Sequence, residues 1–190
     1  MTVEKINIRR ISDGEYRKIA ERQSPELLKR LENCGDDEKK RTLAGRYLLE
    51  KTIKQIYGKE RFQIVYNSNG KPLCDFCFFS ISHSGDYAAV AVSDKPIGID
   101  IQMPDGYKKR AKYMLFSCEE NEFVNNGDSE NRFYTLWTMK ESYVKAVGGT
   151  LSSAAKISLA AGGRLNMRLG NYIFKTEKAD GYFISVCFEE

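Results

Sequence analysis

The chain has 190 residues, of which 42% are hydrophobic and 29% are charged, with a formal net charge of +4. These values are ordinary for a globular protein, and the length allows one domain or two small fused halves. No apolar run approaches the ~18 residues of a membrane span, and Met1 to Arg10 contains no apolar signal-peptide region. We therefore expect a cytoplasmic protein that does not bind membranes.

The charge balance narrows the class of ligand. A mild basic excess suits an anionic ligand or an acidic partner. It is too weak to indicate nucleic acid, because nucleic-acid modules usually carry a clustered basic stripe. We expect no nucleic-acid partner.

The five cysteines are scattered and odd in number, which argues against a disulfide framework. Cys74 and Cys77 form a C-x-x-C motif, but no second such pair follows it. His83, the only histidine, does not complete a zinc pattern. We expect isolated thiols.

The first half of the chain predicts one long helix followed by short strands. An apolar stripe from Arg41 to Tyr57 favours a helix that ends at Gly58. Four strand-like runs follow, at residues 61–66, 78–82, 87–92 and 97–101. The loops joining the last three runs are short, which favours an antiparallel meander.

The second half repeats this order. Residues 117–125 look helical, and Phe133 to Val147 has the strongest helical period in the chain, with Gly148 as its stop. Four strand-like runs come next, at residues 156–159, 164–169, 171–176 and 182–188. A helix followed by a small sheet occurs in both parts of the chain. This order predicts an α+β protein of two halves, residues 1–102 and 103–190.

Polar residues gather where two of the predicted strands end. In a meander the first and third strands run the same way, so Ser82-His83-Ser84-Gly85 and the end of 97–101 meet at one edge. Asp100 and Gln102 share parity and point to one face. A turn rich in hydroxyls and N–H groups can hold phosphate oxygens. The alternative is a plain hairpin turn with a capping aspartate.

The last predicted helix adds a second pair of charges. Glu141 and Lys145 lie four residues apart and therefore on one helical face, beside the apolar stripe. Without further context, the default interpretation is an exposed ion pair worth about 0.3–0.5 kcal/mol.

The ordered set of motifs provides that context. Gly70-Lys71-Pro72 is followed by Phe79-Ser-Ile-Ser-His83-Ser-Gly85, Gly98-Ile-Asp100-Ile-Gln102 and Phe133-Tyr-x-Leu-Trp137-x-Met-Lys-Glu141-Ser-x-x-Lys145. Together they closely resemble the surfactin-type 4'-phosphopantetheinyl transferases. Arg41-Thr42-Leu43 and Gly45 resemble the N-terminal block of that family. The resemblance extends from about Arg41 to Leu151.

This resemblance implies a pseudo-twofold fold, each half a long helix packed on a small antiparallel sheet, with coenzyme A in the cleft between them. It implies transfer of phosphopantetheine from coenzyme A to a serine of an acidic acyl or peptidyl carrier protein. The resemblance implies that Asp100 and Glu141 bind Mg²⁺, that Lys145 neutralises the pyrophosphate and that Glu120 is the general base. It also implies two sets of contacts to coenzyme A. The 3'-phosphate would be contacted by His83, Ser82, Arg41, Thr42 and Arg30, and the adenine by Gly70, Lys71 and Pro72.

One position departs from the family pattern. Gln102 stands where the family commonly has glutamate as a third acidic ligand, so any contribution of Gln102 would be a neutral oxygen or a bridging water. Two carboxylates remain, as in the short holo-carrier-protein-synthase branch of the superfamily.

Other interpretations stay open. The first alternative is a catalytically silent relative that only binds coenzyme A or a carrier protein. A nucleic-acid-binding protein is a more distant one. The carrier, whether of fatty acid, polyketide or nonribosomal peptide synthesis, is not specified by the sequence. Two fused halves favour a monomer.

Overall fold

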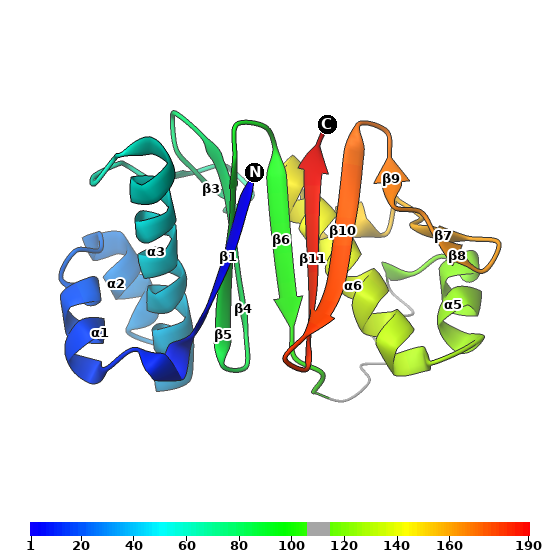
Figure 1. Ribbon diagram of the computed structural model, residues 1–190, viewed down its shortest axis with the longest axis horizontal. Helices are drawn as coiled ribbons and strands as arrows, with labels where there is room; N and C mark the ends of the chain where they lie inside the picture. Colours follow the sequence, from blue (N-terminus) through cyan, green and yellow to red (C-terminus); the bar gives the residue numbers. More distant parts are fainter. Residues whose placement is uncertain (106–114) are drawn as a thin grey trace.

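A computed structural model describes residues 1–105 and 115–190 (Figure 1). The chain begins with β1 (Thr2–Asn7) and a 3-10 turn, η1 (Ile8–Arg10), and continues through α1 (Asp13–Ala20), α2 (Pro25–Leu31) and α3 (Asp36–Tyr57). Of these elements the sequence analysis predicted only α3. That helix ends as expected at Gly58, whose φ of 68° is left-handed.

The first sheet has the strand order β1-β5-β4, with β4 at Phe78–Ser84 and β5 at Tyr87–Ser93. Both neighbouring pairs are antiparallel. Helix α3 packs closely on this sheet, since a Cβ added at Gly45 would lie 2.7 Å from Ile81 Cγ2. A two-stranded hairpin, β2 (Val65–Tyr66) with β3 (Pro72–Leu73), lies between α3 and β4 in the chain. Of the strand predicted at residues 61–66, only Val65–Tyr66 forms a strand in the structure.

The predicted meander is wrong. Strand β6 (Ile97–Gln102) does not continue the first sheet but pairs with β11 (Tyr182–Glu189) in a sheet of order β6-β11-β10-β9. The other members are β10 (Tyr172–Ala179) and β9 (Arg168–Leu169). A short loop favours a hairpin only when no better partner exists, and β11 provides β6 with a full antiparallel ladder.

Strands β4 and β6 nevertheless lie side by side, joined by serine side chains. The hydroxyls of Ser80, Ser82 and Ser84 accept hydrogen bonds from backbone N–H groups of β6 and of the residue that follows it, at 3.1, 3.2 and 2.9 Å. The donors are Ile99, Ile101 and Met103, in the same order along the chain, so the two strands run parallel. The expected meeting of their C-terminal ends is therefore confirmed, although by a different route. We call this contact the serine seam.

The remaining elements complete the second half. Helices α5 (Cys118–Asn125) and α6 (Ser129–Val147) confirm the predicted helices, and α6 ends at the left-handed Gly148. A short helix, α7 (Leu151–Ala154), follows, and then the hairpin β7 (Ala160–Ala161) with β8 (Arg164–Leu165). The predicted strand at 156–159 is wrong, because the strand begins only at Ala160.

The described residues therefore form a mixed α+β fold in which α3 covers one antiparallel sheet and α6 covers the other (Figure 1). A twofold relation between the halves stays a prediction. So does the boundary at residue 102, across which β6 pairs with β11. None of the described helices is both long and apolar enough to cross a membrane.

The cysteines differ from expectation in one respect. All five are free thiols, but Cys74 Sγ and Cys77 Sγ lie only 3.4 Å apart, so these two are not isolated. Burial is the main cause that raises the pKa of Cys77 to about 12.

Gly98 permits the close contact between β6 and α6. A Cβ at this position would lie 1.9 Å from the Ser142 carbonyl oxygen and 2.5 Å from Ala146 N, both backbone atoms. We expect Gly98→Ala to lower the free energy of unfolding by about 1–3 kcal/mol or more, measured by urea denaturation. Gly14→Ala in α1 is the control, since nothing lies within 4 Å of its Cβ position. Equal stability of the two variants would contradict the close packing.

Candidate active site

Asp100 lies at the centre of a buried polar group on the serine seam. Its Oδ1 is 2.6 Å from Lys145 Nζ and accepts a hydrogen bond of 2.8 Å from the Ser82 hydroxyl. Lys145 Nζ also donates to Ser82 Oγ at 2.9 Å. Asp100 is only 6% exposed, and its Oδ2 is buried without a hydrogen-bond partner. An orphaned carboxylate oxygen this deep needs a further cation or donor.

Glu141 brings a second carboxylate to this group. It lies one helical turn before Lys145 on α6 and is half-buried. Burial raises the pKa of Glu141, the charge of Asp100 raises it further, and Lys145 opposes both. The charge of Asp100 disfavours that of Glu141, and Asp100 keeps one orphaned oxygen, so these two carboxylates form a site suited to a hard cation.

Gln102 is half-buried at the end of β6, two residues beyond Asp100 and on the same face of the strand. Within residues 1–105 and 115–190, no three His, Cys, Asp or Glu side chains gather in a way that could hold a metal ion. A candidate metal site here therefore has two carboxylates.

A cavity of about 240 Å³ lies beside Lys145, between the two halves. Gly70, Lys71 and Pro72 line it, as does the end of α6 at Gly148. Lys71 Nζ donates to the Ala146 carbonyl at 2.8 Å, so the β2–β3 hairpin is fastened to the C-terminus of α6. Burial lowers the pKa of this lysine. The structure thus brings the three predicted adenine residues together with Lys145.

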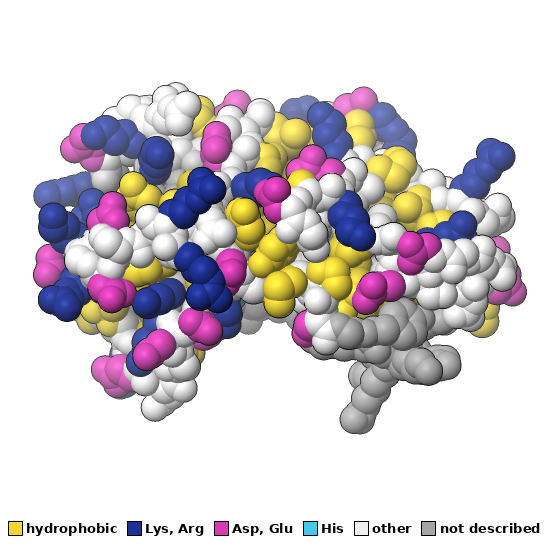
Figure 2. All heavy atoms as spheres, turned by 60° about the horizontal axis from the view of Figure 1, so that its bottom comes forward, with side chains coloured by type: hydrophobic (Ala, Val, Ile, Leu, Met, Phe, Trp, Pro, Cys, Tyr) yellow, Lys and Arg dark blue, Asp and Glu magenta, His cyan; other side chains and the backbone are white. Residues whose placement is uncertain are grey.

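His83 belongs to a neighbouring group on the N-terminal side. Its Nε2 is 3.6 Å from Glu38 Oε1, and Glu38 Oε2 is 3.0 Å from Arg41 Nη2. Burial lowers the pKa of His83, while the charge of Glu38 raises it. Thr42 follows Arg41 on α3 and is half-buried. Figure 2 shows basic side chains interspersed with acidic ones over the side of the molecule that carries α1 to α3.

Ser82 does not share these contacts. Neighbouring residues on a strand face opposite sides, so Ser82 points to Asp100 while the adjacent His83 points to Glu38. The structure places Ser82 with the carboxylates and Lys145 instead of with the predicted 3'-phosphate group.

Glu120 requires a correction. Its carboxylate is fully buried and forms an ion pair of 2.9 Å with Lys140. The oxygens also accept from the Leu159 and Ser117 backbone N–H groups, at 2.8 and 2.7 Å, the latter in a capping box at the start of α5. A carboxylate with every oxygen engaged and no exposed surface cannot receive a proton from a bound substrate. We therefore remove Glu120 from the catalytic residues.

Sequence reasoning missed Glu38, Asn69 and Lys140. Glu38 lies three residues before Arg41 and so on the same helical face, a spacing that could have marked it. Asn69 donates to the Gly148 carbonyl at 2.8 Å across the halves, and no local signal marks that contact. Lys140 donates to the carbonyls of Leu115, Ala154 and Ile157 at 2.7–2.8 Å.

Comparison with known proteins identifies the family of the chain. Residues 96–187 match the model of the 4'-phosphopantetheinyl transferase superfamily. The 4'-phosphopantetheinyl transferase psf-1 of Bacillus pumilus is 30% identical over 164 residues, covering 78% of this chain and 70% of that protein. The transferase Sfp of Bacillus subtilis (strain 168) is 32% identical, with 77% and 73% covered. A Xenopus laevis relative, L-aminoadipate-semialdehyde dehydrogenase-phosphopantetheinyl transferase, is 30% identical with 57% and 43% covered.

The fold, the ordered motifs and these similarities define the class. The chain belongs to the 4'-phosphopantetheinyl transferase superfamily.

The corrected role of Glu120 gives a prediction. Glu120→Gln keeps the shape but leaves Lys140 buried without its carboxylate, so we expect the free energy of unfolding to fall by about 3–5 kcal/mol. Urea denaturation measures this, with Glu119→Gln, an exposed neighbour on α5, as the control. A variant as stable as the control but unable to turn over substrate would restore the general-base assignment.

Proposed function

We propose that this chain transfers the 4'-phosphopantetheine group of coenzyme A to a serine hydroxyl of an acyl or peptidyl carrier protein. The released product would be 3',5'-adenosine bisphosphate. One observation carries the proposal: Asp100, Glu141 and Lys145 converge at the serine seam, beside a cavity lined by Gly70, Lys71 and others. Membership of the superfamily supports it.

Lys145 supplies the fixed positive charge of the proposed mechanism. Phosphoryl transfer to a hydroxyl depends on charge neutralisation and in-line positioning more than on covalent chemistry. The lysine lines the cavity and reaches Asp100, so it can contact the pyrophosphate of a nucleotide bound there. Ser82 holds both side chains in place through its hydroxyl.

The residues present fit a bound Mg²⁺. Asp100 has a free buried oxygen, and Glu141 is a carboxylate disfavoured by the neighbouring charge of Asp100. These two would hold the ion, with Gln102 contributing through a water. When bound, the ion would neutralise charge on the phosphoryl oxygens.

His83, Arg41 and Thr42 would hold the 3'-phosphate, together with Arg30 of α2. Arg30 lies over the Tyr66 ring at 5.8 Å, and Tyr66 pairs with Pro72 in the β2–β3 hairpin. This places a cation next to the segment proposed to line the adenine. The net charge of +4 suits an acidic carrier protein. A monomeric state and a cytoplasmic location stay predictions.

The deciding experiment is a mass measurement. An apo-carrier protein incubated with the chain, coenzyme A and Mg²⁺ should gain one phosphopantetheine, and excess chelator should abolish the gain. Glu141→Gln should lower turnover at least roughly 10²-fold, because it removes one transition-state charge contact. Glu130→Gln, an exposed glutamate on the same helix, is the control.

The possible results separate the alternatives. Equal transfer in chelator would contradict the metal assignment. Coenzyme A binding without transfer to any carrier would favour the catalytically silent relative.

A second prediction tests the 3'-phosphate group. A hydrogen bond to a charged partner is worth about 1.5–3 kcal/mol, so His83→Ala should weaken coenzyme A binding roughly 10- to 150-fold. Dephospho-coenzyme A lacks the 3'-phosphate and should show a much smaller difference between wild type and variant. Calorimetric titration of both ligands measures this. An equal loss for both would mean that His83 is structural.

A further inference from the structure

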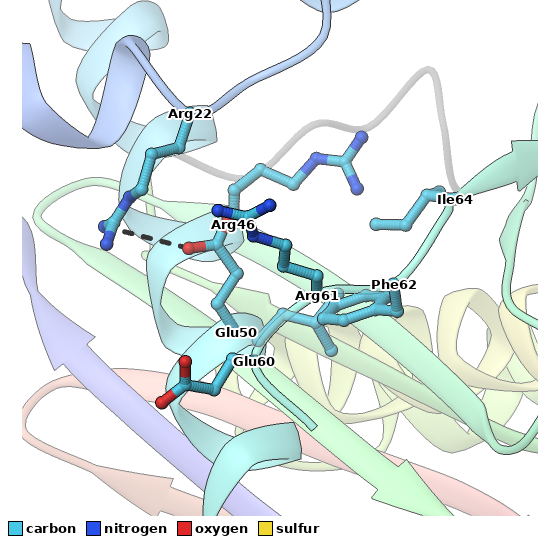
Figure 3. A pocket seen from close by; sticks show the side chains of 8 residues that line it. Arg22, Arg46, Glu50, Glu60, Arg61, Phe62 and Ile64 are labelled. Carbon is cyan, nitrogen blue, oxygen red and sulfur yellow. Dashed lines mark ion pairs between the residues drawn. The ribbon is translucent and has the colours of Figure 1, made fainter. Parts of the chain in front are cut away.

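A second cavity, of about 440 Å³, lies along α3 on a different set of residues from the cavity beside Lys145 (Figure 3). Three arginines and two glutamates supply its charged lining: Arg22, Arg46, Arg61, Glu50 and Glu60. We call it the arginine cavity.

Arg46 is the unusual member of this lining. Its side chain is only 8% exposed, yet among the described residues it forms no ion pair. Nη2 donates to the neutral Tyr66 hydroxyl at 2.7 Å, and Nη1 is buried without an acceptor. Burial lowers the pKa of this guanidinium, and the charge of Arg30 also lowers it, whereas Tyr66 and Glu50 raise it. A buried guanidinium that forms no ion pair and keeps one nitrogen unpaired is costly, so this nitrogen calls for an acceptor such as an anion.

The glutamates of the cavity already have other partners. Glu50 accepts from Gln23 Nε2 at 2.9 Å and lies 3.7 Å from Arg22 Nη2, toward which Figure 3 shows it pointing. Glu60 pairs with Lys54 at 2.6 Å. Arg61 is exposed and, within the described part of the chain, has no carboxylate partner. Neither Arg46 nor Arg61 forms an ion pair within the described residues, and the lining carries three arginines against two glutamates.

We propose that the arginine cavity binds a phosphate-class oxyanion, with Arg46 as the buried anchor and Arg61 as the exposed contact. A guanidinium presents paired N–H donors that match the oxygens of a phosphate group. Nη1 of Arg46 is closed to solvent, so binding involves a rotation of this long side chain that turns the group toward the cavity.

Two sources could supply the anion. One is free inorganic phosphate. The other is a phosphate of the nucleotide substrate, since Tyr66, the partner of Arg46, pairs with Pro72 in the β2–β3 hairpin. Only this second source rests on the proposed function, and the free-phosphate measurement stands without it.

The test is thermal unfolding of the whole chain with inorganic phosphate, against chloride at equal ionic strength. Phosphate should raise the unfolding temperature of wild type to a plateau, as a ligand of the native state does. Arg46→Met should abolish the rise, and in chloride alone it should be at least as stable as wild type, because a buried guanidinium with an unpaired nitrogen is gone. Arg61→Gln should weaken the phosphate affinity roughly tenfold or more. Arg17→Gln, which changes an exposed residue of α1, should match wild type.

Titration of coenzyme A in the presence of phosphate distinguishes the sources. Competition between the two, with weaker coenzyme A binding by Arg46→Met, would assign the cavity to the substrate. Unchanged coenzyme A binding would assign it to free phosphate.

An equal phosphate response in wild type and Arg46→Met would overturn the proposal. So would the absence of any response together with unchanged coenzyme A binding. If Arg46→Met does not fold, the same comparison with Arg61→Gln decides, and the carrier mass assay separately decides the proposed function.

Discussion

The arrangement of the whole molecule depends on the serine seam. The two sheets share no backbone ladder where β4 meets β6, and N–H groups of β6 would remain unpaired there. Hydroxyls at every second position of β4 accept these N–H groups, so side chains replace a ladder. Because the central hydroxyl, Ser82, also donates to Asp100, the contact that joins the halves also orients the central carboxylate of the candidate site. The same serine hydroxyl therefore serves both to join the two halves and to position Asp100.

The ion pairs of two α6 lysines, Lys140 with Glu120 and Lys145 with Asp100, show how burial separates structural from functional charges. Lys140 and Glu141 are consecutive in sequence, yet about 100° apart around the helix. Lys140 points inward, where Glu120 and three carbonyls hold its ammonium, and this fixes the rotation of α6. Glu141 is thereby turned toward Asp100 and Lys145. A fully satisfied buried pair supports the helix, whereas the pair at the seam keeps an oxygen of Asp100 free.

Much of the fold could be predicted where the signal is local. The long α3 and α6 follow from apolar periods and end at left-handed glycines, Gly58 and Gly148. The capping box of Ser12 and the Ser24-Pro25 start show that α1 and α2 also carried local signals, which were overlooked. The place of β6 could not be derived from loop length, because its partner β11 lies some eighty residues later. For the same reason the burial of Glu120 was invisible, since Lys140 and the Leu159 N–H reach it from distant segments.

The neutral side chain at Gln102 is best understood through the charges that surround it. Asp100 and Glu141 carry two negative charges against the one positive charge of Lys145, and burial already raises the pKa of Glu141. A third carboxylate on the same face of β6 would add repulsion in a region of low exposure, and burial makes such repulsion costly. An amide avoids that cost at the expense of attraction for a cation. The two carboxylates and Lys145 therefore leave one negative charge at the site. A single bound divalent ion would change this net charge to one positive charge.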